Sequence, residues 1–219
     1  MASVSQGSGA LTRSIDPLGA MLTNLRNTVA AGFVLTLIIF ILVRLFLGKG
    51  IGLDSAWWTF CFRWLHVISG TMWIGLLWYF NLVQIPNMGK IPDEQKPAIG
   101  KVIAPAALWW FRWGAMATIV TGLILAWMNG YLWDALSLGL TDNGASMPIG
   151  IGMWLGIIMW INVWFGVWPN QNRALGIVDA SSEENSASTK TAILFLRANM
   201  LLSIPMLFFM LGKSHSGFS

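Results

Sequence analysis

Long apolar stretches alternate with polar, glycine- and proline-rich segments along the chain. A transmembrane helix needs about 20 predominantly apolar residues, and five stretches come close to or exceed that length. They predict membrane spans at about residues 29–47, 57–85, 106–128, 149–168 and 191–211. The second stretch is longer than a bilayer requires, so we expect it to be tilted or to extend beyond the lipid.

The segment before the first span, residues 1–28, is a polar N-terminus with a short amphipathic pattern. Its apolar residues recur at helical spacing at Ile15, Leu18, Leu22 and Leu25, with Asp16 as a candidate N-cap and Pro17 at the first helical position. This pattern predicts a helix lying on the membrane surface. Residues 29–212 are then a single transmembrane domain, and residues 213–219 are a polar tail.

The predicted fold class follows from these segments and from the composition. It is an all-α polytopic membrane protein, a five-transmembrane-helix bundle preceded by a short amphipathic N-terminal helix. The chain has 219 residues, of which 56% are hydrophobic and only 10% charged, and its mean hydropathy is +0.65. That leaves too little polar surface to cover a soluble globule of this size.

Cysteine and charge exclude several classes of function. The one cysteine, Cys61, excludes an intramolecular disulfide, a CxxC metal site and a CxxCH haem attachment. The net charge of +4 does not indicate a nucleic-acid partner, because the basic residues are spread over loops and span ends. No Ser/His/Asp set, phosphate-binding loop or intramembrane carboxylate pair is present to support hydrolysis or nucleotide binding.

The basic residues predict the orientation in the membrane. Loops and ends on the side of the N-terminus carry most of them: Arg13, Arg26, Lys90, Lys96, Lys101, Arg173 and Lys190. By the positive-inside rule, we expect a cytoplasmic N-terminus and, after five spans, a periplasmic C-terminus.

One face of the second span collects its polar side chains. Every third or fourth residue gives Arg63, His66, Gly70, Trp73, Leu77, Asn81 and Gln84. This face is expected to point into the bundle. The opposite face is expected to contact lipid and shows Phe62, Ile68, Leu76 and Phe80.

His66 is the only histidine inside an apolar stretch, since His215 lies in the tail. It is a candidate haem axial ligand, metal ligand, proton-relay group or hydrogen-bonded structural histidine. For haem b, Gly70 leaves room for a macrocycle and Arg63 could pair with a propionate. The second axial ligand would be a methionine such as Met116 or Met159, a histidine of another subunit, or none.

Three arginines and one amide within the predicted spans are candidate polar contacts. No aspartate or glutamate falls inside a predicted span, so Arg63, Arg112 and Arg197 must use carbonyls, lipid phosphates, water, a partner protein or an anionic ligand, or else extend to the headgroups. Asn162 lies deep in the fourth span, whose Gly152 and Gly156 form a small-residue seam that lets another helix approach closely.

Short tryptophan-rich motifs recur from the second span onward. They are Arg63-Trp64-Leu65-His66, Trp73-Ile74-Gly75, Tyr79-Phe80-Asn81, Trp110-Phe111-Arg112-Trp113-Gly114, Asn162-Val163-Trp164 and Trp168-Pro169-Asn170-Gln171. Together they resemble the membrane domain of bacterial membrane-bound urate hydroxylases, the urate oxidase N-terminal domain family. The resemblance marks Arg63, His66, Arg112, Asn162 and the turn with Asn170 and Gln171 as site positions.

This resemblance implies a bacterial inner-membrane protein associated with the oxidation of urate to 5-hydroxyisourate, with electrons leaving through a cytochrome c. The family's enzymes carry more spans and a C-terminal cytochrome c domain, whereas this chain has five predicted spans and no CxxCH. The resemblance therefore implies either a separate cytochrome c or a short form that serves as a subunit of something else.

Three functions are consistent with the sequence. The first is a redox-associated membrane protein, an oxidoreductase or a subunit of one, that binds haem b through His66. The second is a non-catalytic accessory subunit of a homo-oligomer or larger membrane complex, supported by the glycine seam and the many tryptophans. The third is a small anion permease that uses Arg112, Asn162 and Arg197.

Overall fold

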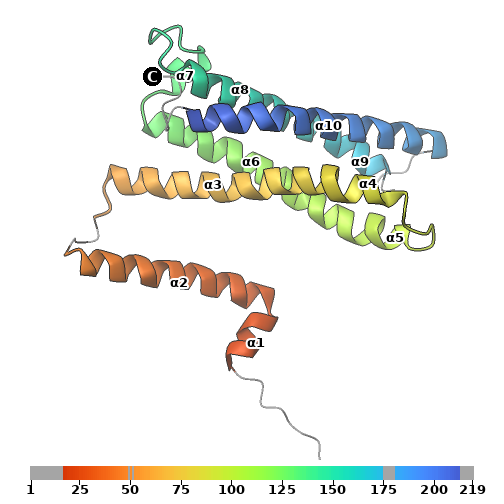
Figure 1. The fold of residues 1–219 in the computed structure, drawn as a ribbon, viewed down its shortest axis with the longest axis horizontal. Helices are drawn as coiled ribbons and strands as arrows, with labels where there is room; N and C mark the ends of the chain where they lie inside the picture. The colour runs from red at the N-terminus through yellow and green to blue at the C-terminus, as the bar shows by residue number, and fades with distance from the viewer. Residues whose placement is uncertain (1–16, 49, 51, 175–180, 213–219) are drawn as a thin grey trace, which may run out of the picture. The chain divides into compact units, whose positions relative to one another are not determined.

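The computed structural model describes residues 17–48, 50, 52–174 and 181–212, and all regular secondary structure in these residues is helical (Figure 1). Five helical stretches are long and apolar enough to cross a membrane: Leu25–Phe46, Ser55–Met88, Lys96–Met128, Met147–Ala174 and Glu183–Gly212. The predicted all-α fold with five spans is thereby confirmed. The chain divides into two units, residues 1–53 and residues 54–219, and each is described by itself.

The first unit contains α1 (Pro17–Thr23) and α2 (Leu25–Phe46). Pro17 begins α1, as its fixed φ favours, whereas the predicted cap Asp16 lies outside the described residues. Asn24 separates the two helices, because its side chain accepts hydrogen bonds from backbone amides in the first turn of α2. Arg44, in the last turn of α2, donates a hydrogen bond to the carbonyl of Gly50.

The second unit is a bundle of four long helices: α3 (Ser55–Tyr79), α6 (Ala104–Met128), α8 (Met147–Ile161) and α10 (Ser182–Gly212). Helix α3 packs mainly against α6, and α8 packs mainly against α10 (Figure 1). Four short helices lie at the ends of the bundle: α4 (Ile85–Met88), α5 (Lys96–Ala98), α7 (Leu132–Leu136) and α9 (Trp168–Ala174). Figure 1 shows α4, α5 and α9 at one end and α7 at the other.

Three π-helical turns join these elements: η1 (Phe80–Gln84), η2 (Ile99–Ile103) and η3 (Asn162–Val167). Each π turn ends two residues before a proline, at Pro86, Pro105 and Pro169. A proline inside an α-helix lacks an N–H donor and collides with the carbonyl of the preceding turn. A wider π turn moves that carbonyl away, so the helix continues through the proline.

These prolines explain where the predicted spans were too short. The spans were expected to end at residue 85, begin at 106 and end at 168, in each case beside a proline. The helical stretches instead run to Met88, from Lys96 and to Ala174. Proline was interpreted as a helix terminus, whereas here it lies just beyond a π turn within a continuous stretch.

The main core lies where α3, α6, α8, η3 and α10 meet. Its most deeply buried side chains include Trp73, Leu77, Phe111 and Met159, each at most 1% exposed. The predicted inward face of α3 is confirmed at its centre, but the expectation that Phe80 contacts lipid is wrong. Phe80 is 2% exposed and lies edge-to-face against Phe111, with ring centroids 5.6 Å apart. Phe80 follows Trp73 by seven residues and Leu77 by three, so the helical period itself places it on the inward face.

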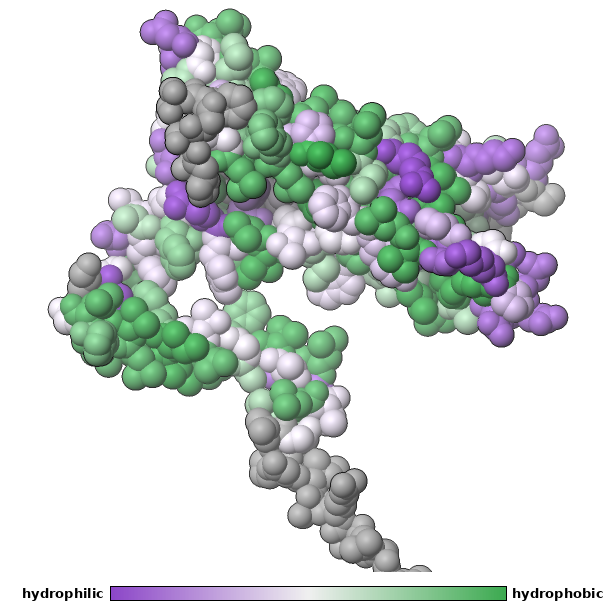
Figure 2. Space-filling model, in the orientation of Figure 1, coloured by the Kyte–Doolittle hydropathy of each residue, from purple (hydrophilic) through white to green (hydrophobic). Residues whose placement is uncertain are grey.

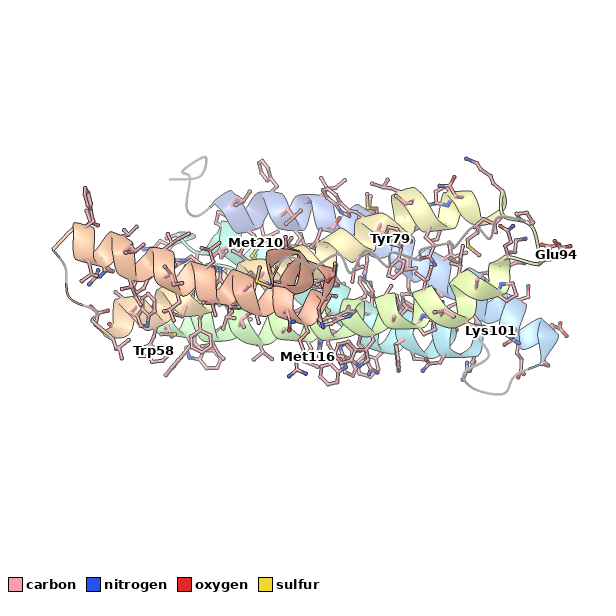
Figure 3. The ribbon with its side chains drawn as sticks, turned by 90° about the horizontal axis from the view of Figure 1, so that it is seen from below. Trp58, Tyr79, Glu94, Lys101, Met116 and Met210 are labelled. Atoms are coloured by element: carbon pink, nitrogen blue, oxygen red, sulfur yellow. The ribbon has the colours of Figure 1, made fainter. Side chains whose placement is uncertain are left out.

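Hydrophobic and hydrophilic surfaces are separated along the bundle. On the face shown in Figure 2, hydrophilic residues gather at the end that carries α4, α5 and α9, and the surface between the ends is mostly hydrophobic. In Figure 3, Glu94 and Lys101 lie at that hydrophilic end and Trp58 lies toward the other. This distribution is compatible with a multi-pass membrane protein. The direction of insertion stays a prediction.

Candidate functional site: a histidine seam and an arginine–tryptophan cluster

His66 lies on α3 where this helix packs against α6, and its ring is hydrogen-bonded across the interface. Nδ1 is 2.9 Å from the carbonyl oxygen of Thr118 and 3.3 Å from the hydroxyl oxygen of Thr121. Because a carbonyl can only accept, Nδ1 carries the proton and donates a hydrogen bond to the carbonyl oxygen of Thr118; in the neutral ring Nε2 keeps its lone pair. The ring also fills a notch at Gly122, where a Cβ atom would lie 2.8 Å from Cε1.

The surroundings of His66 do not fit a haem. A macrocycle bound through Nε2 needs open space on both sides of that atom, but α6 lies directly against the ring at Gly122. Gly70, the expected cradle, faces the same helix, and a Cβ atom there would be 3.8 Å from Thr118 Cγ2. Gly70 therefore admits α6 rather than a macrocycle. The geometry favours the hydrogen-bonded structural histidine, and haem b at His66 stays a prediction.

The other residues expected around that haem are spread over the bundle. Arg63 is exposed, and its charge acts on the phenol of Tyr131, whose pKa is raised by burial and lowered in part by Arg63. Met159 is fully buried in the main core. Met116 is half-buried and lies near the middle of the bundle in Figure 3. Among the described residues, no group of three or more His, Cys, Asp or Glu side chains could hold a metal ion.

A second polar site is built around Arg112 on α6. Its guanidinium carbon lies over three indole rings, 3.7 Å from the centroid of Trp168, 4.9 Å from that of Trp164 and 5.4 Å from that of Trp113. We call these four residues the Arg112 site. Cation–π contacts of this kind orient a guanidinium and become stronger where water is excluded.

The Arg112 site is positioned by a regular tryptophan pattern on two elements. Trp160, Trp164 and Trp168 are spaced four residues apart, so they follow one side of the helix from α8 through η3 to α9. On α6, Trp109 and Trp113 have the same spacing, and the rings of Trp113 and Trp164 meet edge-to-face with centroids 5.8 Å apart. This spacing is visible in the sequence, and it was the signal that could have located the site.

The donor groups of Arg112 are not used within the described structure. No hydrogen bond from Arg112 forms within the described residues, and its Nε is buried. The only salt bridge within the same residues joins Lys96, the first residue of α5, to Asp93 in the preceding loop at 2.5 Å. Among the described residues, Arg112 is therefore a cation whose hydrogen-bond donors have no acceptor, and it lies against a wall of indole rings.

The buried amide of Asn81 satisfies carbonyl groups beside η1. Its Nδ2 donates to the carbonyl of Leu77, 2.9 Å away, and to that of Leu196 on α10, 3.2 Å away. Leu77 lies three residues before the π turn, and its carbonyl accepts from Asn81 in addition to the backbone N–H of Phe80. Asn81 thus stabilises the π turn and joins α3 to α10.

The same arrangement recurs at η3. Met159 lies three residues before this π turn, and its carbonyl accepts a hydrogen bond of 3.0 Å from Nδ2 of the fully buried Asn199. Asn162, the first residue of η3, donates from Nδ2 to Oδ1 of Asn199 at 2.9 Å. The amide nitrogen of Asn162, predicted as a substrate or partner contact, is therefore engaged inside the bundle.

No family model, curated protein or solved structure matches this chain. Function is therefore inferred from the geometry of the two sites and from the motifs alone.

The remaining predicted contacts are Asn170 and Gln171 on α9 and Arg197 on α10. Asn170 donates from Nδ2 to the carbonyl of Gly166 in η3, 2.8 Å away, and Gln171 is half-buried beside it on α9. Arg197 is exposed on α10. Of the predicted site positions, the structure brings Arg112 against Trp168, the first residue of the Trp168-Pro169-Asn170-Gln171 motif.

The two candidate sites are separate. Arg112 precedes Gly122, the contact of His66, by ten residues on α6. At 1.5 Å per residue, this places the sites about 15 Å apart along the helix axis. They are therefore two sites rather than one.

Proposed function

We propose that the protein is a redox-associated integral membrane protein whose Arg112 site binds a planar organic anion, with urate as the anion that the family resemblance implies. The supporting observation is the stacking of Arg112 on Trp168 at 3.7 Å. This contact joins two of the motifs that carry the resemblance. The redox centre would belong to a partner, and a separate cytochrome c is the partner that the resemblance implies.

The chemistry of the Arg112 site supports an anionic ligand. A guanidinium presents several N–H donors in one plane and pairs with two oxygens at once, while its face stacks on an aromatic ring. The elements that build the site, α6, α8, η3 and α9, contain no aspartate or glutamate that could neutralise the charge. An anion arriving from outside the chain would supply both the missing charge and the missing acceptors.

Binding of urate to the detergent-purified protein tests this proposal. We expect saturable binding by equilibrium dialysis with labelled urate, and a loss of affinity of about tenfold or more in Arg112→Gln, because a charge-assisted pair is removed. Arg44→Gln is the matched control, since Arg44 lies in the first unit and donates to Gly50. Wild-type protein that is folded but binds no urate would refute the proposal.

A further inference from the structure

Three donors without acceptors gather in the tryptophan cluster around Arg112. Within the described residues, Arg112 Nε, Trp160 Nε1 and Trp164 Nε1 are all buried and have no hydrogen-bond partner. The groups are in ring contact: Arg112 lies over Trp164, and the rings of Trp160 and Trp164 have centroids 6.5 Å apart. Buried polar atoms are normally paired, so three unpaired atoms in one cluster need an explanation.

The chemical type of these groups restricts what could pair with them. Guanidinium and indole nitrogens only donate hydrogen bonds and cannot accept them. A water or an alcohol could accept two of these hydrogen bonds, but neither would neutralise the charge of Arg112. An oxyanion supplies a negative charge together with several lone pairs, so it complements a cationic set of donors.

We infer that Arg112, Trp160 and Trp164 form one donor set that binds the oxygen atoms of an oxyanion. This inference rests on the proposed function, because it assigns additional ligand contacts to the Arg112 site. It adds that the indole N–H groups of Trp160 and Trp164 bind the ligand, in addition to any packing role of their rings. The same oxygen chemistry is presented by a soluble organic anion and by the phosphate of a lipid headgroup.

Phenylalanine variants separate the indole N–H from the aromatic ring. Trp160→Phe and Trp164→Phe keep an apolar ring in place but remove the donor. Each is expected to weaken urate binding about tenfold, the effect of one hydrogen bond to a charged group. Trp127→Phe is the control, because Trp127 is 69% exposed. In 15N-tryptophan-labelled wild-type protein, the Nε1–H resonances of Trp160 and Trp164 should shift on ligand addition.

The outcomes distinguish this inference from the function on which it rests. If wild-type protein binds urate and Arg112→Gln does not, while both phenylalanine variants bind normally and the indole resonances stay fixed, the donor set is refuted and the proposed function stands. If wild-type protein binds no urate, but phosphatidylglycerol in nanodiscs shifts the two indole resonances, the donor set is supported and its ligand is a lipid phosphate. If neither urate nor phosphatidylglycerol shifts the two indole resonances, the inference is overturned. This measurement uses wild-type protein, so its result does not depend on whether a phenylalanine variant folds.

Discussion

The contact between His66 and Gly122 gives a sharp prediction for the stability of the bundle. In Gly122→Ala, the new Cβ atom would lie 2.8 Å from His66 Cε1, whereas ordinary contact begins at 3.4 Å. The ring must therefore move by 3.4 − 2.8 = 0.6 Å. Overpacking of this kind costs about 1–3 kcal/mol, and the shift weakens the hydrogen bond to Thr118, which contributes about 1 kcal/mol. Alanine regains about 1 kcal/mol of helix propensity.

We therefore expect Gly122→Ala to lower the free energy of unfolding by about 1–3 kcal/mol. In the His66→Ala background the collision is absent, so the same change should stabilise by about 1 kcal/mol. Reversible unfolding of the detergent-solubilised protein in increasing SDS measures both. Gly75→Ala is the control, because nothing lies within 4 Å of the added Cβ atom. Equal effects of Gly122→Ala in the two backgrounds would refute the reasoning.

Three further predictions follow from individual contacts. Asn199→Leu should cost about 1–3 kcal/mol in the same SDS assay, because the carbonyl of Met159 loses a side-chain donor and Nδ2 of Asn162 loses its acceptor; an unchanged midpoint would contradict this role. Lys96 holds the pKa of the Asp93 carboxyl below its usual value, by a hydrogen bond and by its charge. Because the folded-state pKa of Asp93 is lowered, its contact with Lys96 stabilises the fold above the unfolded-state pKa, and this stabilisation is lost as the pH falls through the folded-state pKa. Lys96→Ala removes the contact and should therefore raise the pKa of Asp93, which an NMR titration measures. Finally, the reduced-minus-oxidised spectrum of the purified protein should lack a haem signal, and stoichiometric haem b that is lost in His66→Ala would instead support the haem prediction.

Hydropathy was sufficient to predict the five spans and the inward face of α3, because both depend on local sequence. The predicted span limits were wrong at Pro86, Pro105 and Pro169, because a proline was taken, by the usual rule, to end the helix. The rule assumes α-helical geometry on both sides of the proline, whereas a π turn two residues earlier changes that geometry. Phe80 was assigned to the wrong face although it follows Trp73 by seven residues and Leu77 by three, a spacing that places it on the inward face of a helix.

The candidate sites depend on contacts between distant segments, and this limited what the sequence could predict. His66 was correctly singled out as a polar residue of the bundle interface, but only the position of Gly122 on α6 shows why the ring sits there. Arg112 was predicted as a polar contact. Its stacking partners Trp164 and Trp168 were not predicted, because they lie far along the chain from Arg112. The spacing of these tryptophans predicts a stripe and does not say which cation meets it.

The most direct test of the anion-binding proposal compares urate titrations of the wild-type protein and Arg112→Lys. Lysine keeps the positive charge but cannot form a planar fork that stacks on Trp168 and pairs with two oxygens. The account predicts saturable binding by the wild-type protein and about tenfold weaker binding by Arg112→Lys. Equal affinity of the two proteins would contradict the role of the stacked guanidinium, and folded wild-type protein without affinity for urate would contradict the proposed function itself.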